Sequence, residues 1–356
     1  MNQHKSILDK IKFVCPNCKA SLTVNNDKFI CQTCSKKWAI REGIPLFEKI
    51  SFRPDLEKFW TKDKTDELFE KSRTLDWNSF KNDYFFQEYP HWYDFFFNDG
   101  RADGLFLVPS HVDSLALDLG CGWGTFSRPL SRRFNTVISV DLMYEKLKWI
   151  NIWKEKENIN NVCPILANSF NLPFPNNYFD LVVMNGFLEW AGIEESSKTI
   201  TEMQIDILKY VFNLMKEGGY LYIGIENRYN CSYLLGEPDH NGLLFTSFMP
   251  RFLANFWSRI KGKGKYRIYT YSYKGYEKLL YRAGFKNIKF YFSLPGYNLP
   301  QWILPAESKN AYNYFLNNIF VPNSKKKMLL WLGLKALSMI GLEKLFIPSF
   351  SIICRK

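Results

Sequence analysis

The sequence predicts a doubly wound α/β fold, in which a seven-stranded, mostly parallel sheet carries helices on both faces and ends in an antiparallel strand. Two observations predict this fold. From Leu115 onward, short apolar runs alternate with longer amphipathic segments, which is the pattern of repeated strand–helix units. A glycine-rich stretch also follows the first apolar run directly, as the first strand-to-helix turn of such folds requires. A small cysteine-bearing unit precedes this core.

The individual elements follow from the spacing of apolar residues. Short apolar runs predict strands at Leu115–Leu119, Thr136–Val140, Cys163–Ala167, Phe179–Met184, Tyr220–Ile225, Lys286–Phe292 and Phe350–Cys354. Helical periodicity fills most gaps between them, for example at Tyr144–Glu157, Ile200–Met215 and Tyr273–Ala283. We expect Ser272 to cap the last of these helices, because a serine hydroxyl can accept a hydrogen bond from a free N–H of the first turn.

Changes in composition divide the 356 residues into parts. Two stretches are longer than a minimal core needs, and loops of such length usually carry function or structure of their own. The predicted parts are a metal-binding ribbon at 1–50, a helical extension at 51–112, an α/β core at 113–293 and 349–356, an insertion over the substrate side of the sheet at 227–271, and a C-terminal lid at 294–348.

The composition fits a folded protein, with 46% hydrophobic and 23% charged residues. The net charge of +12 favours an anionic partner such as nucleic acid, anionic lipid or a phosphorylated substrate, or it is an ordinary solvated surface. The first residues do not form a secretory signal, and no run reaches the ~20 apolar residues that span a bilayer. Four of the eight cysteines are scattered singly, so we expect a reduced, cytoplasmic compartment.

The strongest local signal is the glycine loop Asp118-Leu-Gly120-Cys121-Gly122-Trp-Gly124. Glycines let the backbone turn sharply and approach a ligand closely, and N–H groups at the start of the next helix favour an anionic group. The G-x-G-x-G spacing differs from the G-x-G-x-x-G of a dinucleotide site. It favours S-adenosylmethionine, which brings no pyrophosphate. The alternative is a plain strand-to-helix turn in another Rossmann-like protein.

A second acid, Asp141, ends the next predicted strand. Its distance from Asp118 suits the end of the second strand of one βαβ unit, where a carboxylate can accept both ribose hydroxyls. We expect the side chain of Asn168, after the third strand, to contact the adenine edge. Besides the glycine loop, the residues expected around the cofactor are Asp141, Leu142, Asn168, Ser169, Phe170 and Asn185.

In this order the segments resemble the type 11 class of S-adenosylmethionine-dependent methyltransferases. That family carries an acid-L-G-C-G-x-G loop, an acid closing the second strand, a D-A-x-x-L-P-F-x-x-x-x-F-D stretch and an L-K-P-G-G turn. The matching segments here are Asp118–Gly124, Asp141, Asn168–Asp180 and Leu214–Gly219. The resemblance covers about 113–293 and the final strand, and it implies an S-adenosylmethionine-dependent methyltransferase. Asn168 stands where the family has Asp, and Glu217 where it has Pro. We expect Asp180 to stabilise the start of strand four.

The other four cysteines form the pairs Cys15-x2-Cys18 and Cys31-x2-Cys34. This spacing predicts two knuckles that hold one structural zinc ion through four thiolates, because a catalytic zinc keeps an open position and normally uses histidine. The segment resembles the zinc ribbon of activator partners of tRNA and protein methyltransferases, and ribbons fused to some bacterial rRNA methyltransferases. It contacts RNA through its lysines or serves as a docking surface, and we favour the docking surface.

Two residues are candidates for a general base. His240 lies in the first insertion, which follows strand five at the edge where α/β sites form. Glu189 follows strand four, at a position that faces the methyl donor or acceptor in related enzymes. Each has a structural alternative, a hydrogen-bonded loop histidine and a helix-start carboxylate. The stretch Met184–Phe187 differs from the Asn-Pro-Pro-Tyr of nucleobase amine methyltransferases, which leaves hydroxyls, carboxylates, carbon centres and small metabolites open.

Two basic stretches stand outside these motifs. Lys261–Arg267 is a glycine-rich loop that either grips phosphate or is a solvated turn, and we favour the turn. Within 325–347, three lysines precede an apolar stretch too short to span a membrane. That stretch either lies against anionic lipid, as a peripheral membrane contact, or packs on the core as a lid helix, which we favour.

Three functions follow. We favour methyl transfer to a hydroxyl of a small molecule or of a surface-glycan precursor. The alternative is an rRNA or tRNA methyltransferase that uses the ribbon for RNA contact. The third is a scaffold with a vestigial cofactor site, against which the intact glycine loop and Asp141 argue.

Overall fold

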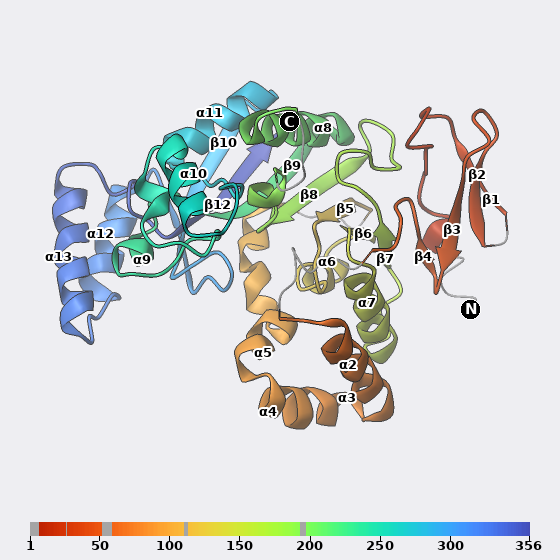
Figure 1. Ribbon diagram of the computed structural model, residues 1–356, viewed down its shortest axis with the longest axis horizontal. Coiled ribbons are helices and arrows are strands. Elements are labelled where there is room, and N and C mark those ends of the chain that lie inside the picture. The colour runs from red at the N-terminus through yellow and green to blue at the C-terminus, as the bar shows by residue number, and fades with distance from the viewer. Residues whose placement is uncertain (1–6, 26, 52–58, 110–112, 193–196) are drawn as a thin grey trace. The chain divides into compact units, whose positions relative to one another are not determined.

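An eight-stranded sheet forms the α/β core of this computed structural model, with the strand order β11-β10-β12-β9-β8-β5-β6-β7 (Figure 1). Strands β8, β5, β6 and β7 are parallel neighbours, whereas β12 pairs antiparallel with β10. The mostly parallel sheet with an antiparallel last strand is therefore confirmed. The strands are β5 (Leu115–Leu119), β6 (Thr136–Asp141), β7 (Val162–Leu166), β8 (Phe179–Asn185), β9 (Met215–Glu226), β10 (Asn287–Leu294), β11 (Trp302–Pro305) and β12 (Ser349–Arg355).

The eighth strand, β11, corrects the predicted count of seven. It pairs antiparallel with β10 through four residue pairs, from Tyr291–Pro305 to Leu294–Trp302. Its four residues Trp-Ile-Leu-Pro are too few to show a period, and they stand inside the segment predicted as a lid. Only the pairing with β10 makes them a strand.

The structure describes residues 7–25, 27–51, 59–109, 113–192 and 197–356. It divides into two units, residues 1–184 with 213–220 and residues 185–212 with 221–356. The first unit carries the cysteine pairs and the glycine loop, and the second carries both long insertions. Of the predicted extension at 51–112, residues 52–58 and 110–112 lie outside the described residues.

Three helices between strands agree with the predicted ones to within one residue, namely α7 (Tyr144–Lys156), α8 (Ile200–Leu214) and α11 (Tyr273–Ala283). The short helix α6 (Ser127–Ser131) follows the glycine loop. Ser272 caps α11 as predicted, because its hydroxyl accepts a hydrogen bond from the Gly275 N–H at 3.4 Å. Gly284 ends the same helix with a φ of 111°, a left-handed conformation that glycine adopts easily.

The N-terminal segment is a four-stranded antiparallel sheet, which we call the ribbon. Its strands are β1 (Leu22–Asn25), β2 (Lys28–Cys31), β3 (Lys37–Arg41) and β4 (Ile44–Pro45). The Phe13 ring lies 4.6 Å from Phe29 and 5.8 Å from Phe174, which belongs to the α/β core. The Phe47 N–H donates a hydrogen bond of 2.8 Å to the carbonyl of Leu166, at the end of β7. The ribbon is therefore packed against the β7 side of the core.

Residues 59–109 are largely helical and pack on the glycine loop. They form α2 (Lys62–Thr74), α3 (Trp77–Ser79), the π-helix η1 (Phe80–Phe85), α4 (Phe86–Glu88), α5 (Pro90–Phe97) and the 3-10 helix η2 (Asp99–Leu107). Trp123, inside the loop, is buried, with its ring 5.5 Å from Trp60 and 4.8 Å from Phe96. The Thr125 hydroxyl donates a 2.7 Å hydrogen bond to the carbonyl of Phe95. This extension thus fixes one side of the loop.

Both insertions contain helices of their own. The first holds α9 (Cys231–Leu234), the 3-10 helix η4 (Thr246–Phe248) and α10 (Arg251–Ile260), and the second holds β11, α12 (Lys309–Asn318) and α13 (Lys325–Met339). Helices α12 and α13 lie side by side (Figure 1), and the Trp331 indole N–H donates a 2.6 Å hydrogen bond to the carbonyl of Leu316.

Candidate active site and metal centre

The glycine loop has the backbone that its sequence predicts. Gly120, Gly122 and Gly124 have φ angles of 73°, 52° and 79°, which residues with a side chain rarely adopt. A Cβ on Gly124 would lie 2.7 Å from Cγ1 of Ile150, so this glycine lets helix α7 approach the loop. A Cβ on Gly122 would meet no described atom within 4 Å. Gly122 therefore leaves open space above the loop, as a ligand-binding turn requires.

Asp141 ends strand β6, as predicted, and lies against this loop. Its carboxylate accepts hydrogen bonds of 2.9 Å from the N–H of Gly122 and of 2.9 Å from the N–H of Met143. It is half-buried, as is the adjacent Leu142. Because each carboxylate oxygen has a second lone pair, Asp141 can still accept hydroxyl hydrogens from a ligand.

Asp118, the first residue of the motif, points into the protein. It is 2% exposed, and its carboxylate accepts a 2.6 Å hydrogen bond from the Ser127 hydroxyl, which lies 2.7 Å from the hydroxyl of Ser139. Burial raises the pKa of Asp118 to about 7. The neighbouring Cys121 is also buried. The contacts of Asp118 therefore join strand β5 to helix α6, on either side of the glycine loop, and so stabilise the loop.

The segment after β7 carries a ring suited to an adenine. The Asn168 carbonyl oxygen accepts a 3.0 Å hydrogen bond from the N–H of Phe170, which closes a tight turn. Ser169 is half-buried, while the Phe170 side chain is 40% exposed. An exposed aromatic ring offers a stacking surface.

Asn185 ends strand β8 and belongs to the second unit. Its amide oxygen is buried and has no hydrogen-bond partner among the described residues. A Cβ on Gly224 would lie 2.0 Å from this oxygen, so only glycine fits opposite it. A buried acceptor without a partner costs about 1–3 kcal/mol, which a ligand that donates a hydrogen bond would offset.

The four cysteines of the ribbon come together as predicted. Their sulfur atoms all lie within 4.8 Å of one another, with 3.6 Å between Cys15 and Cys34 and 3.4 Å between Cys18 and Cys31. Four sulfurs around a tetrahedral zinc, each at about 2.3 Å, are separated by about 3.8 Å. The observed cluster is close to that spacing, and four thiols fit the donor set of a structural zinc site.

Glu189 is the most deeply buried of the candidate catalytic groups. It lies in the 3-10 helix η3 (Leu188–Trp190), directly after β8, and is 0% exposed. One carboxylate oxygen is 3.5 Å from the hydroxyl of Tyr297, and the other has no partner among the described residues. Burial raises the pKa of Glu189 to about 7, against the opposing charge of His240. Near neutral pH this carboxyl group can therefore both hold and accept a proton.

His240 is paired with a residue that the sequence did not single out as a site residue. Its Nε2 lies 3.1 Å from Oε2 of Glu226, at the end of β9, in an ion pair rather than a well-aligned hydrogen bond. Burial alone lowers the pKa of His240, but the Glu226 carboxylate outweighs it and raises the pKa to about 9. The hydroxyl of Tyr233 also donates to Glu226. At neutral pH His240 therefore carries its proton.

The side chain of Asp239 forms its hydrogen bonds with residues of the first insertion and not with its neighbour His240. It is buried and accepts hydrogen bonds from the hydroxyls of Tyr266, at 2.6 Å, and Thr246, at 2.8 Å. The structure thus brings Glu189, His240 and the additional residues Glu226, Tyr233 and Tyr297 together in the second unit. Glu226 could have been suspected from the sequence, because an acid closes strand β9 as Asp141 closes β6.

Comparison with known proteins agrees with this geometry. Residues 117–223 match the family model described as a methyltransferase domain. That range contains the glycine loop, Asp141, Asn168, Asn185 and Glu189. The chain therefore contains a methyltransferase domain.

Individual relatives share this domain at low identity. An uncharacterized protein of Methanocaldococcus jannaschii is 28% identical over 214 residues, which are 57% of this chain and 82% of that protein. A ubiquinone/menaquinone biosynthesis C-methyltransferase of Wigglesworthia glossinidia brevipalpis is 32% identical over 122 residues, 32% of this chain and 43% of that enzyme. The chain thus spans less than half of this named enzyme.

A solved complex of a methyltransferase activator and a methyltransferase from Haloferax volcanii aligns with a TM-score of 0.46 at 12% identity, covering 86% of this chain and 99% of that one. Among the described residues, no helix is both long and apolar enough to cross a lipid bilayer.

Proposed function

We propose that this chain methylates a hydroxyl oxygen of a small molecule or of a glycan precursor, and that Glu189 accepts the hydroxyl proton. The observation that carries this proposal is the buried Glu189 carboxyl group, with a pKa near neutrality and one oxygen free of described partners. A hydroxyl group is a weak nucleophile at neutral pH, so its methylation benefits from a base of matched pKa.

The cofactor would supply the electrophilic methyl group of its sulfonium centre. In the first unit, Asp141 would accept the ribose hydroxyls, the backbone at Gly122 would lie against the ligand, and Phe170 would stack on the adenine. The open space at Gly122 supports this fit.

The roles of the two candidate bases differ. His240 keeps its proton at neutral pH because of Glu226, so it would act as a fixed positive charge rather than as the base. Glu189, which titrates near pH 7, is the better acceptor for a proton. The nearby imidazolium would stabilise the negative charge that Glu189 bears before it takes that proton.

We infer further that the four ribbon thiolates hold one structural zinc ion and that the ribbon serves as a docking module within the chain. Two observations support docking rather than RNA contact. The aromatic core of the ribbon contacts Phe174. Of the ribbon lysines, Lys19 donates a hydrogen bond of 3.1 Å to Asn171 and Lys36 one of 3.0 Å to Asn17.

For segment 325–347 we propose two alternatives, a lid helix packed on the core and a peripheral membrane contact. Helix α13 packs through the buried Leu334, and its Trp331 bonds to α12, which supports a lid helix. Leu329 and Leu332 are exposed on the same helix, next to the lysines at its start, which supports peripheral contact with anionic lipid.

The test uses S-adenosylmethionine with a tritiated methyl group, incubated with the protein and with separate small-molecule, lipid and RNA extracts of the source cells. We expect label in the small-molecule or lipid fraction, in a form that resists both ribonuclease and mild alkali. A methyl ether survives alkali, whereas a methyl ester releases methanol. At S-adenosylmethionine concentrations below the dissociation constant, Asp141→Ala and Glu189→Gln should each label very little. Label that ribonuclease releases would overturn the proposal in favour of the RNA alternative, and alkali-labile label would identify a carboxylate acceptor.

A further inference from the structure

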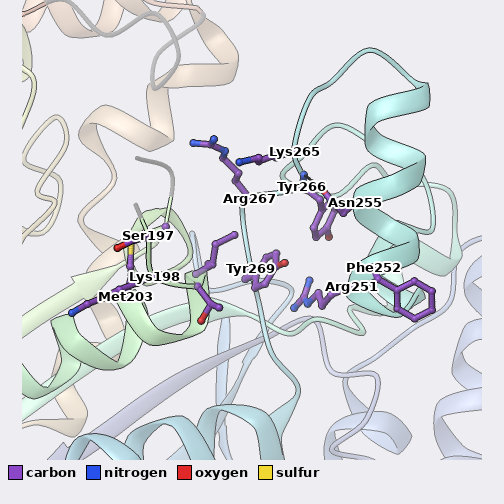
Figure 2. Close-up of a pocket in the computed structure, with 13 residues that line it drawn as sticks. Ser197, Lys198, Met203, Arg251, Phe252, Asn255, Lys265, Tyr266, Arg267 and Tyr269 are labelled. Carbon is purple, nitrogen blue, oxygen red and sulfur yellow. Dashed lines mark hydrogen bonds between the residues drawn. The ribbon is translucent and has the colours of Figure 1, made fainter. Parts of the chain in front are cut away.

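A basic pocket with a volume of about 620 Å³ opens on the second unit (Figure 2). Three separate segments line it, from the start of α8, from α10 and from the loop after α10. Among its described lining residues there are four cationic side chains and no carboxylate. The cations and the rings beside them are Lys198, Arg251, Lys265, Arg267, Tyr266 and Tyr269.

Arg251 is the anchor of this pocket. Its guanidinium stacks on Tyr269, 4.1 Å from the ring centroid, and its Nη2 donates to the carbonyl of Thr270. Its Nη1 is buried and has no hydrogen-bond partner among the described residues. A guanidinium cannot shed its charge, and a buried donor of a charged group is costly when unsatisfied. A fixed cation with one unsatisfied donor therefore lines the pocket.

The other polar groups around the pocket leave it positively charged. Lys198 forms an ion pair with Asp206 at 2.6 Å, so its charge is balanced. The hydroxyl of Tyr266 is already directed to Asp239. Lys265 is exposed and extends into the region that Figure 2 shows between Arg267 and Tyr266. An acceptor with two or more negative charges would match this arrangement.

We propose that this pocket binds a phosphate or diphosphate group of the methyl acceptor. Arginine forks match phosphate oxygens in pairs, and tyrosine rings accommodate the rest of such a ligand. The volume exceeds that of one phosphate group. The inference rests on the proposed function only in naming the ligand as the acceptor, because the anion site itself is independent of any methyl transfer.

One buried side chain joins this pocket to the candidate base. The Gln204 amide donates hydrogen bonds of 2.9 Å to the carbonyl of Leu188 and of 3.0 Å to the carbonyl of Tyr269. Leu188 immediately precedes Glu189, and Tyr269 lines the pocket. Gln204 therefore connects the Tyr269 side of the pocket to helix η3, which carries Glu189.

The phosphate could be borne by a soluble ester or by a lipid. Helix α10 contributes Arg251 to the pocket, and the same helix exposes a row of large apolar side chains, among them Phe252, Phe256 and Ile260. Such a row beside basic residues is typical of a surface that rests on anionic lipid. A soluble ester and a lipid would present the same phosphate group, so the experiment below includes a separate test for each.

The experiment is calorimetric titration of the purified full chain with inorganic pyrophosphate, and with uridine diphosphate as a soluble ester. Lys265→Glu is compared with Lys263→Glu, an exposed lysine two residues away that does not line the pocket. Arg251→Gln is compared with Arg259→Gln on the exposed part of the same helix. We expect Lys265→Glu and Arg251→Gln each to weaken pyrophosphate binding by about tenfold or more, and the two controls to change it less than about twofold.

Vesicles of phosphatidylcholine with and without phosphatidic acid form the second arm. Binding to phosphatidic acid vesicles that Lys265→Glu abolishes identifies a lipid phosphate, and binding to uridine diphosphate alone identifies a soluble one. The proposal fails if pyrophosphate does not bind the folded protein, or if the pocket variants bind as the controls do. It also fails if a single-stranded RNA oligonucleotide displaces pyrophosphate at far lower concentration. Titration with S-adenosylmethionine, with Asp141→Ala as control, tests the methyl donor separately, so the two proposals can fail independently.

Discussion

His240 and Glu226 form a half-buried ion pair, with 3.1 Å between Nε2 and Oε2. The pair joins the first insertion to the end of strand β9, since His240 lies in the loop after α9 and Glu226 closes the strand. Tyr233 of α9 donates to the same carboxylate. Helix α9 and the loop after it therefore converge on one acid, and the charge on His240 depends on that acid.

This pair predicts a stability that falls at alkaline pH. The folded-state pKa of His240, about 9, is above the ordinary histidine pKa of 6.5, so its contribution to stability is fully present below pH 6.5 and is lost as pH rises through 9. We expect the free energy of unfolding to fall by about 2 kcal/mol between pH 7.5 and 9.5. Urea denaturation across that range measures it. In His240→Gln the fall should be much smaller, and an unchanged fall in this variant would assign the effect to other groups.

Glu189 predicts the pH dependence of methyl transfer. A base must be deprotonated, so kcat/KM should rise as pH increases through about 7 and then level off. Glu189→Gln keeps the shape of the side chain without the base. We expect it to lower the rate by about 100-fold or more and to remove the rise. His240, Glu226 and Tyr297 surround this group and remain in the variant. A rise that persists in Glu189→Gln would show that another group titrates.

Asp141 and Asp180 form a matched pair of acidic substitutions. Asp141 lies at the glycine loop, whereas Asp180 accepts a 2.8 Å hydrogen bond from the N–H of Leu115 and pairs with Lys216. Asp141→Ala should weaken S-adenosylmethionine binding by about 2 kcal/mol, or about thirtyfold, in a calorimetric titration. Asp180→Ala should lower the melting temperature and leave this affinity nearly unchanged. Equal losses of affinity in both variants would mean that Asp141 acts only through folding.

Substitutions at Gly122 and Gly124 should distinguish an effect on ligand binding from an effect on packing. Gly122→Ala places a methyl group in open space with φ near 52°, so we expect a loss of about 1 kcal/mol in stability and a larger loss in S-adenosylmethionine affinity. Gly124→Ala forces a contact with Ile150 at 2.7 Å and should mainly lower stability. Thermal denaturation and titration of both variants check this order. The open space is not a ligand site if Gly122→Ala binds as tightly as the unaltered chain.

The cysteine cluster predicts one zinc ion per chain. Cys18→Ser should remove that zinc, as measured by elemental mass spectrometry, because three thiolates leave the tetrahedral set incomplete. Without metal the ribbon loses most of its folding energy, so peptides from 13–47 should exchange amide hydrogens much faster while those from 115–166 stay protected. Cys354→Ala, at a buried cysteine of β12 outside the cluster, should keep its zinc. A metal-free protein with a protected ribbon would contradict the assignment.

Much of the core could be predicted because its signals are local. Strand β5, the positive φ angles of the loop glycines, the cap at Ser272 and the cysteine spacing each depend on a few adjacent residues. The short strand β11 could not be predicted, because its partner β10 alone makes it a strand.

The residues around the proposed acceptor site were harder to predict, because they too are brought together by tertiary contacts rather than by adjacent sequence. Lys265 and Arg267 belong to a stretch for which a solvated turn was favoured. Both line the pocket, whereas Lys261 and Lys263 are exposed and do not line it. The partner of His240 is 14 residues away in sequence, so its raised pKa follows from tertiary contact alone.

The attachment of the ribbon to β7 has a consequence for solubility. Strand β7 is the last strand in the order of the sheet. Among the described residues, the bridge between Leu166 and Leu46 and the hydrogen bond from Phe47 lie on its outer edge. An uncovered edge strand is a template for pairing with another chain. The ribbon thus covers the edge of β7 and protects it from pairing with another chain. If the ribbon unfolds after zinc loss, we expect this edge to become available for self-association.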